Sequence, residues 1–271
     1  MDLGLSGKIA LVTGGSKGIG AAIALELARE GADVVICARE AGPLDETARR
    51  IAELGRQALA VPADCASAAG VLAVVDGAAA TFGRVDILIN NVGGAPGAGG
   101  FMNLSDADWQ GAFELNLMSA VRFSRAVIPG MVARRWGRII NIASTSAREP
   151  DIVVVHYNSA KAGLLALSKT LATAYAQDGV LVNCVSPGLT RTPAVEKSAA
   201  KRLIERGESV DDLSADEVVQ RYYGPRRPLP IGRFGVPEDL AGIVAFLASE
   251  RASWISGAYI NVDGGWVKSI Y

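Results

Sequence analysis

The chain has 271 residues, of which half are hydrophobic and a fifth charged, and its formal net charge is −1. Such a balance indicates a globular protein with no overall field to hold nucleic acid or an anionic membrane. Cys37, Cys65 and Cys184 stand far apart in the sequence without metal-ligand spacing, the start has no basic and apolar leader, and no segment is apolar enough to span a bilayer. We therefore expect a cytoplasmic protein in a reducing compartment, without a metal site or a disulfide framework.

Short apolar runs rich in Val and Ile alternate with longer amphipathic stretches. They predict seven strands, at residues 8–13, 33–38, 58–62, 86–91, 137–144, 180–187 and 258–262. Because strands that are apolar throughout indicate a sheet covered on both faces, and intervening helices make the strands parallel, we expect one doubly wound α/β domain over residues 1–271. Residues 193–236 break the alternation with charges, Pro and Gly, which predicts helical segments inserted over the sheet's edge.

The motif "TGGSKGIG", Thr13 to Gly20, lies between the first predicted strand and the first predicted helix. Gly14, Gly18 and Gly20 allow a tight turn and a close backbone approach, so that a pyrophosphate can sit on the positive end of the helix. The spacing GxxxGxG departs from the generic GxGxxG fingerprint and is typical of a narrower group. The motif predicts a dinucleotide site.

The end of the second predicted strand indicates which dinucleotide binds. An acidic side chain about 20 residues after the glycines would bind the ribose 2′-hydroxyl of NAD. Ala38 takes that place here, Arg39 follows it, and Lys17 can approach the same ribose from the other side. Two cations around one phosphate favour NADP(H) over NAD(H), although either charge alone is typical of a solvated surface.

The stretch "HYNSAK" contains the only histidine, His156, directly before Tyr157. Helical periodicity places Tyr157 and Lys161 on one helix face, while His156 points elsewhere, away from the nicotinamide and toward a lid or the substrate entrance. Tyrosine, with a pKa of about 10, needs its anion stabilised to serve near neutral pH. The Lys161 ammonium and an oxidised nicotinamide ring would lower the pKa of Tyr157. The alternative is a tyrosine at the core's edge beside a solvated lysine.

These motifs occur together with "NNVG" (90–93), "NIAS" (141–144), "PGLTRT" (187–192) and "SGAYINVDGG" (256–265). In this order they resemble the classical short-chain dehydrogenase/reductase family over nearly the whole chain. Val92 replaces the alanine that is commoner in "NNVG". The resemblance implies a seven-stranded parallel Rossmann sheet, assembly as a homotetramer or homodimer, and hydride transfer between a nicotinamide and a carbonyl or secondary alcohol, as in 3-oxoacyl-acyl-carrier-protein reductases.

The resemblance also implies a catalytic tetrad. Tyr157 would be the general acid of ketone reduction and the base of alcohol oxidation. Lys161 would hold the nicotinamide ribose, and Ser144 would stabilise charge on the substrate oxygen. Asn116 would retain a water that links Lys161 to solvent, or would alternatively be a satisfied buried amide. The nearby hydroxyls of residues 145 and 146 do not match the family spacing.

The family's cofactor contacts carry over to further positions. Asp64 would accept a hydrogen bond from the adenine, with the Cys65 backbone alongside, and Asn91 and Gly93 would line the adenosine ribose. In residues 187–192 the backbone and one of two threonine hydroxyls would fix the nicotinamide face. The full predicted set is Gly14, Ser16, Lys17, Gly18, Ile19, Gly20, Arg39, Asp64, Cys65, Asn91, Gly93, Tyr157, Lys161, Pro187, Gly188, Leu189, Thr190 and Thr192.

The substrate side is less determined by the motifs. The family places a mobile lid after "PGLTRT", here residues 193–236. Its Tyr222, Tyr223, Arg226 and Arg227 could meet an aromatic or anionic substrate, or belong to an ordinary solvated lid. The glycine-rich run 93–100 follows the fourth predicted strand, at the edge where substrates bind in this architecture.

Three functions from different classes remain open. They are an NADPH-dependent ketoreductase, an alcohol or dihydrodiol dehydrogenase working toward oxidation, and a catalytically silent dinucleotide-binding scaffold, which the intact tetrad disfavours. Docking of an acidic acyl carrier protein would suit Arg134 and Arg135, but Asp178 stands where such reductases often carry a basic residue. The substrate, its stereochemistry and the physiological direction are left open by the sequence.

Overall fold

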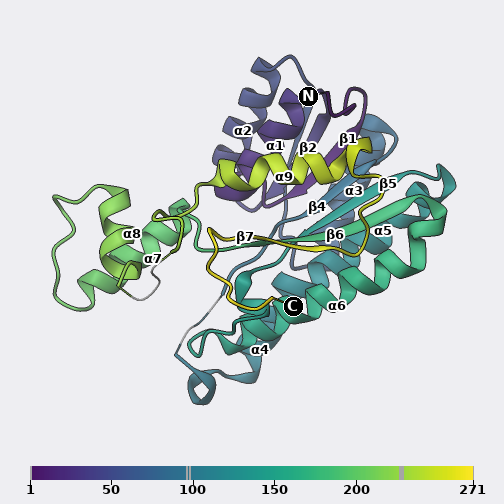
Figure 1. The fold of residues 1–271 in the computed structure, drawn as a ribbon. Helices are drawn as coiled ribbons and strands as arrows, with labels where there is room; N and C mark the ends of the chain where they lie inside the picture. The colour runs from purple at the N-terminus through teal and green to yellow at the C-terminus, as the bar shows by residue number, and fades with distance from the viewer. Residues whose placement is uncertain (1, 96, 98, 226–228, 271) are drawn as a thin grey trace.

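A single sheet of seven parallel strands runs through the protein, which a computed structural model describes for residues 2–95, 97, 99–225 and 229–270 (Figure 1). The strand order is β3-β2-β1-β4-β5-β6-β7. This confirms the predicted doubly wound α/β sheet, and the predicted strand ends are shifted by at most two residues. The strands are β1 (Ile9–Thr13), β2 (Asp33–Ala38), β3 (Ala58–Pro62), β4 (Ile87–Asn90), β5 (Gly137–Ile142), β6 (Val180–Pro187) and β7 (Tyr259–Val262).

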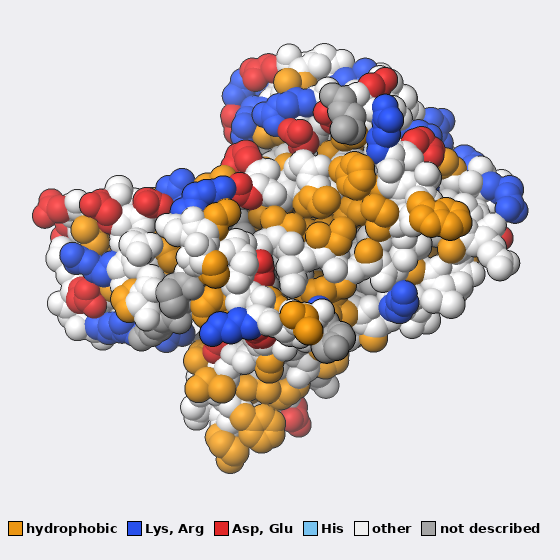
Figure 2. Space-filling model, viewed as in Figure 1, with side chains coloured by type: hydrophobic (Ala, Val, Ile, Leu, Met, Phe, Trp, Pro, Cys, Tyr) orange, Lys and Arg blue, Asp and Glu red, His pale blue; other side chains and the backbone are white. Residues whose placement is uncertain are grey.

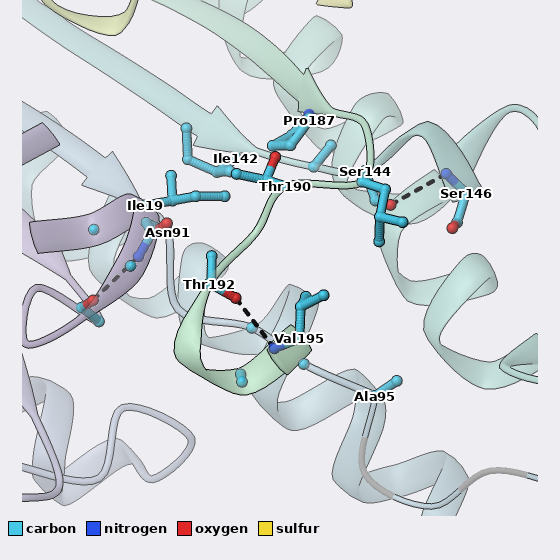
Figure 3. Close-up of a pocket in the computed structure, with 18 of the residues that line it drawn as sticks. Ile19, Asn91, Ala95, Ile142, Ser144, Ser146, Pro187, Thr190, Thr192 and Val195 are labelled. Carbon is cyan, nitrogen blue, oxygen red and sulfur yellow. Dashed lines mark hydrogen bonds between the residues drawn. The ribbon is translucent and has the colours of Figure 1, made fainter. Parts of the chain in front are cut away.

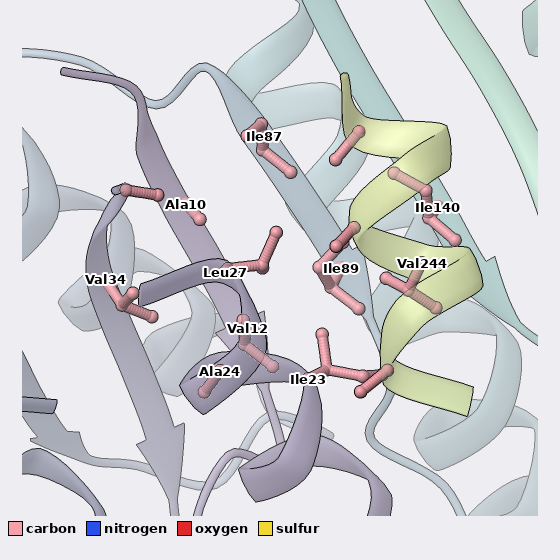
Figure 4. Close-up of a cluster of buried hydrophobic side chains, with 14 of the residues drawn as sticks. Ala10, Val12, Ile23, Ala24, Leu27, Val34, Ile87, Ile89, Ile140 and Val244 are labelled. Carbon is pink, nitrogen blue, oxygen red and sulfur yellow. The ribbon is translucent and has the colours of Figure 1, made fainter. Parts of the chain in front are cut away.

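Helices cover both faces of the sheet, so the central strands are buried on both sides, whereas the edge strands β3 and β7 are only partly buried. On one face lie α1 (Gly18–Arg29), α2 (Ala41–Glu53) and α9 (Pro237–Ala248), and on the other α3 (Ala68–Phe82), α5 (Ser119–Ala133) and α6 (Val155–Tyr175). Figure 4 shows Ile23 of α1 and Val244 of α9 packed beside Val12 and Ile89. Because side chains alternate along a strand, Leu11 points into the opposite core, which explains why these strands are apolar throughout.

Between β4 and α5 the chain forms two short helical segments and an unusual turn. The short 3₁₀ segment Phe101–Asn103 leads into α4 (Asp106–Phe113), whose start is fixed by a capping box of Ser105 and Asp108. A π-helical turn, Glu114–Met118, joins α4 to α5. Further 3₁₀ segments are Thr145–Ala147, Ala176–Asp178 and Glu250–Ala252. Such π turns often mark functional sites, and this one contains the predicted catalytic Asn116.

The predicted helical insertion consists of α7 (Pro193–Ile204) and α8 (Ala215–Tyr223). They pack on each other through a small core of their own, made of Ala199, Leu203, Val218, Val219 and Phe234. Figure 1 shows the pair standing out from the layers of sheet and helices, and Figure 2 shows charged side chains of both signs on its surface. None of the described helices could cross a membrane, and the described residues contain no cluster of metal-ligating side chains.

Candidate active site

The carboxyl ends of β1, β4, β5 and β6 surround a cavity of about 530 Å³ (Figure 3). A second cavity of about 190 Å³ adjoins it and shares Gly14, Lys17, Val92 and Gly93 with it. The first cavity is lined by the predicted residues Gly14, Lys17, Gly18, Ile19, Gly20, Asn91, Gly93, Ser144, Tyr157, Lys161, Pro187, Gly188, Leu189, Thr190 and Thr192, and the second adds Ser16, Arg39, Asp64 and Cys65. The structure thus brings every predicted cofactor position into two adjoining cavities.

The glycine loop forms one wall of the first cavity, and its backbone conformation requires glycine. Gly14 and Gly18 have φ values of +67° and +55°, in the left-handed region that L side chains rarely adopt. A Cβ on Gly20 would lie 2.1 Å from the carbonyl oxygen of Gly14. The N-cap of α1, Lys17, makes no capping bond with its side chain, so the first-turn N–H groups are available to an anion. This cradle fits a pyrophosphate.

The loop after β4 is fastened to the glycine loop through Thr13, a fully buried residue. Its hydroxyl oxygen accepts hydrogen bonds from the backbone N–H groups of Asn91 and Val92, at 2.9 and 3.0 Å. The Asn91 side chain donates to the carbonyl oxygen of Thr13 at 2.9 Å. Asn91 therefore holds two walls of the cavity together. Thr13 had no predicted role, although its place at the end of the first strand was a usable signal.

Three of the predicted catalytic side chains meet where β5 and α6 approach each other. Ser144 follows β5 by two residues, accepts a hydrogen bond from the N–H of Ser146 at 3.1 Å, and is hydrogen-bonded to the Tyr157 hydroxyl. Lys161, one helical turn beyond Tyr157, is buried and donates to the carbonyl oxygen of Ile142 at 2.8 Å. Its Nζ lies 5.8 Å from the centre of the tyrosine ring. The periodicity argument for this pair is confirmed.

The electrostatics of this group differ from the expectation. Burial raises the pKa of Tyr157, while its hydrogen bond with Ser144 acts in the opposite direction. Burial also lowers the pKa of Lys161 to about 8. Lys161 does not by itself bring the pKa of Tyr157 below its ordinary value, because desolvation dominates, and the expected lowering with an oxidised nicotinamide bound stays a prediction. Cys184 beside Lys161 stays a thiol, because burial raises its pKa to about 12.

Asn116 lies behind the cavity wall, and the described lining residues of the two cavities do not include it. Its side-chain amide donates to the carbonyl oxygens of Gly94 and Ala112 at 2.8 and 2.9 Å, and its Oδ1 accepts from the N–H of Gly94 at 3.0 Å. A Cβ on Gly93 would lie 2.8 Å from this oxygen and 3.0 Å from Lys161 Nζ. The π turn thus presents Asn116 to the loop that passes over Lys161.

The second cavity contains, beside the predicted Lys17 and Arg39, a carboxylate that was not predicted, that of Glu40. Lys17 Nζ lies 2.7 Å from Glu40 Oε2, and this hydrogen bond lowers the pKa of Glu40. Arg39, Glu40 and Asp64 line the same cavity. Lys17 is therefore already paired, which corrects the expectation of two cations free to share one phosphate. Glu40 directly follows Arg39 in the sequence, and its charge could have been considered.

His156 does not face a lid or an entrance, so that expectation is wrong. Its side chain is fully buried, and its ring meets Trp109 of α4 edge-on with ring centres 6.2 Å apart. The helical geometry of α6 points the His156 side chain away from Tyr157 and into the contact between α4 and α6. An aromatic ring suits that position, because it fills space between two helices.

The substrate side of the cavity is formed by the segment that follows β6. Thr190 donates to the carbonyl oxygen of Gly188 at 3.2 Å, and Thr192 caps α7 by accepting from the N–H of Val195 at 3.3 Å. Tyr223 of α8 also lines this cavity, and with Tyr222 it lines a wider cleft of about 1280 Å³ beyond it. Arg226 and Arg227, and residues 96 and 98 of the glycine-rich run, lie outside the described residues. Lining residues outside the predicted catalytic and cofactor sets are Val92, Gly94, Ala95, Ile142, Ala143, Thr145, Ser146, Pro193, Ala194, Val195 and Tyr223.

Comparison with known proteins identifies this arrangement. Residues 8–203 match the family described as short chain dehydrogenase. The chain belongs to the short-chain dehydrogenase family. It is 35% identical to D-beta-hydroxybutyrate dehydrogenase of Cupriavidus necator over 266 residues, covering 97% of this chain and 99% of the relative. It is 36% identical to a 3-oxoacyl-acyl-carrier-protein reductase of Salmonella typhimurium over 264 residues, covering 97% and 98%.

A solved reductase has nearly the same structure. L-Sorbose reductase of Gluconobacter frateurii, complexed with NADPH and L-sorbose, superposes with a TM-score of 0.91 at 41% identity, over 100% of both chains. Together with the enzymes named above, it shows that this short-chain dehydrogenase is an oxidoreductase acting on CH–OH or C=O groups.

Proposed function

We propose that the protein is an NADP(H)-dependent ketoreductase in which Tyr157 exchanges the proton with the substrate oxygen. One observation carries the proposal. Tyr157, Ser144 and Lys161 share the wall of a cavity whose opposite wall is the glycine loop. A nicotinamide dinucleotide fits the two adjoining cavities, with its pyrophosphate on the start of α1 and its adenine beside Asp64. When bound, it would supply or accept the hydride.

The residues of the chain would handle the proton and the substrate oxygen. Ser144 holds the Tyr157 hydroxyl and would donate a hydrogen bond to the substrate oxygen, stabilising the charge that develops there. In reduction, Tyr157 gives its proton to that oxygen, and in oxidation it takes the proton back. Its raised pKa keeps the hydroxyl protonated at neutral pH, which suits the direction of reduction. Lys161 would hold the ribose hydroxyls and replenish the proton, with Asn116 positioning the loop beside it.

Two features support NADP(H) over NAD(H). Ala38 ends β2 where an acid would repel a 2′-phosphate, and Arg39 lines the adenosine end of the site. The relative of known structure contains NADPH. Lys17 would have to leave Glu40 to join Arg39, so Glu40 works against this preference.

Arg39→Ala should lower the NADPH to NADH ratio of kcat/KM at least about tenfold, since a charge-assisted hydrogen bond to phosphate is lost. Glu40→Gln should raise that ratio about two- to fivefold, the range of an exposed ion pair. Arg50→Ala, which removes an equally exposed charge from α2, is the control. A wild-type ratio near or below one, or equal effects of the two arginine variants, would contradict the preference.

The substrate we propose is a small polar ketone that enters through the cleft beside α8. L-Sorbose in the related structure supports a ketose, whereas D-beta-hydroxybutyrate dehydrogenase supports the oxidative direction. Arg134 and Arg135 precede β5, at the edge opposite the cavity, and Arg134 contacts Asp86 at 3.5 Å. They therefore lend no support to carrier docking. Cytoplasmic location and a homotetramer or homodimer remain predictions.

Assaying ketoses, 3-oxoacyl thioesters, simple ketones and the matching alcohols with both cofactors, at the nicotinamide absorbance, tests the function directly. We expect the highest kcat/KM for a ketone with NADPH. Turnover of alcohols alone would favour the oxidative dehydrogenase, and a carrier-linked substrate that outperforms its free thioester would favour carrier docking. No turnover with any pair, together with normal NADPH binding, would favour the silent scaffold.

A further inference from the structure

Two cysteines that are 28 positions apart in the sequence meet at the adenosine end of the site. Their sulfur atoms lie 3.5 Å apart, Cys37 near the end of β2 and Cys65 in the loop after β3. Both side chains are buried among the residues of the core that α3 and α5 cover. The two cysteines are far apart in the sequence but close together in the fold, because β2 and β3 are neighbours in the sheet.

The two thiols differ in access. Cys65 lines the second cavity together with Arg39 and Asp64, whereas Cys37 is fully enclosed behind it. The hydrogen bond between the thiols lowers the pKa of Cys65, and the same bond, followed by burial, raises the pKa of Cys37. A small oxidant arriving through the cavity would therefore meet Cys65 first, with Cys37 in place behind it. A disulfide of about 2.05 Å requires the sulfur atoms to approach by about 1.5 Å, which moves both side chains and draws on the backbone that carries them.

We propose that Cys37 and Cys65 form a reversible disulfide under hydrogen peroxide, and that dinucleotide bound in the second cavity opposes its formation. The Cys65 thiolate attacks one peroxide oxygen and breaks the O–O bond, giving a sulfenic acid and, after protonation, one water. The Cys37 sulfur then attacks the sulfenic sulfur, and a second water leaves. Two thiols and one peroxide thus yield one disulfide and two waters. A thiol reductant reverses the bond by exchange.

The disulfide would act on the cofactor site through the backbone. The carbonyl oxygen of Cys37 accepts hydrogen bonds from the N–H groups of Gly14 and Gly15, at 2.8 and 3.2 Å. Asp64, the predicted adenine contact, immediately precedes Cys65. Drawing the two sulfur atoms together therefore pulls on the start of the glycine loop and on the adenine wall at once. This consequence for NADP(H) rests on the proposed function, whereas formation of the bond does not.

Peptide mapping of the wild-type protein under non-reducing conditions tests the bond without any cofactor. After brief peroxide treatment we expect a linked pair of tryptic peptides containing residues 37 and 65, a protein mass lower by about 2 Da, and full reversal by dithiothreitol. Cys184→Ala, which removes the remaining buried thiol, should give the same linked pair. Sulfinic or sulfonic acid at Cys65 without any linked peptide would overturn the proposal, as would linkage that involves Cys184.

Protection by NADP⁺ tests the second part of the proposal, that bound dinucleotide opposes formation of the disulfide. At ten times its Kd, NADP⁺ should slow formation of the linked pair about tenfold, because only the empty site reacts. The oxidised protein should bind NADPH several-fold more weakly, measured by NADPH fluorescence and compared with the same sample after reduction. Linkage at an unchanged rate, with NADP⁺ binding shown independently, would overturn the opposition to cofactor. Linkage in a protein that binds no NADP(H) would instead refute the proposed function and leave the disulfide standing.

Discussion

The glycine-loop side of the cavity and the α7–α8 side are built in different ways. The glycine loop is fixed by backbone hydrogen bonds to β2, by Thr13 and Asn91, and by close approaches that exclude any Cβ at Gly20. Helices α7 and α8 are held largely by their own small core, and they reach the cavity through a few side chains such as Val195 and Tyr223.

This difference explains why the sequence predicts the glycine-loop side of the cavity better than the α7–α8 side. A backbone cradle leaves the same glycines in the sequence whatever the substrate, so it reveals the cofactor class. A wall made of side chains on a separately packed pair of helices can change without disturbing the sheet. With the proposed function, reaction chemistry would therefore depend on the glycine-loop side and on α6, and substrate choice on the α7–α8 side.

The largest effect is expected where the two sides meet, at Tyr157. Tyr157→Phe removes the proton donor but keeps the ring, so kcat for ketone reduction should fall about 10³-fold, within the range of general acid catalysis. NADPH binding, measured by fluorescence, should change little. Tyr175→Phe makes the same substitution in the last turn of α6, away from the cavity, and should keep wild-type turnover. Retained activity in Tyr157→Phe would show that another group supplies the proton.

Gly20→Ala tests the rigidity of the glycine-loop side. The added Cβ would lie 2.1 Å from the carbonyl oxygen of Gly14, so the loop must shift. We expect a loss of about 1–3 kcal/mol of stability, as for other overpacked positions, and NADPH binding weaker by about tenfold or more. Gly42→Ala in α2, where a Cβ meets nothing within 4 Å, is the matched control and should be neutral or slightly stabilising. Normal NADPH binding by Gly20→Ala would mean that the loop is adaptable.

The pH dependence of reduction tests the proposed role of Lys161. Burial lowers the pKa of Lys161 to about 8, so its positive charge is present below that pH and lost above it. The pKa of Tyr157 is raised, so the tyrosine stays protonated across this range and does not cause the decline. We expect kcat/KM for ketone reduction to fall about tenfold per pH unit above pH 8. Circular dichroism should show the protein still folded, and a profile that stays flat to pH 10 would contradict the assignment.

The sequence revealed features that local patterns determine and missed features that depend on contacts between distant elements. The strands were predictable because a sheet covered on both faces needs unbroken apolar runs, and Tyr157 and Lys161 because helical spacing fixes their common face. The meeting of Cys37 with Cys65 depends on which strands are neighbours. The pairing of Lys17 with Glu40, the π turn around Asn116 and the burial of His156 against Trp109 depend on side-chain packing between distant elements. Local patterns do not contain that information.

The smallest effect is expected on the α7–α8 side, and it distinguishes a substrate-contacting lid from an ordinary solvated one. Tyr223 lines the catalytic cavity, whereas its neighbour Tyr222, whose ring it meets edge-on at 4.7 Å, lines only the outer cleft among the described residues. If the Tyr223 hydroxyl meets the substrate, Tyr223→Phe should raise the ketone KM about two- to tenfold, the value of one hydrogen bond, and leave the NADPH KM unchanged. Tyr222→Phe should change neither. Because both variants keep the aromatic packing of α8, equal effects from the two would assign the change to the helix pair as a whole, and no effect from either would make the lid a solvated cover.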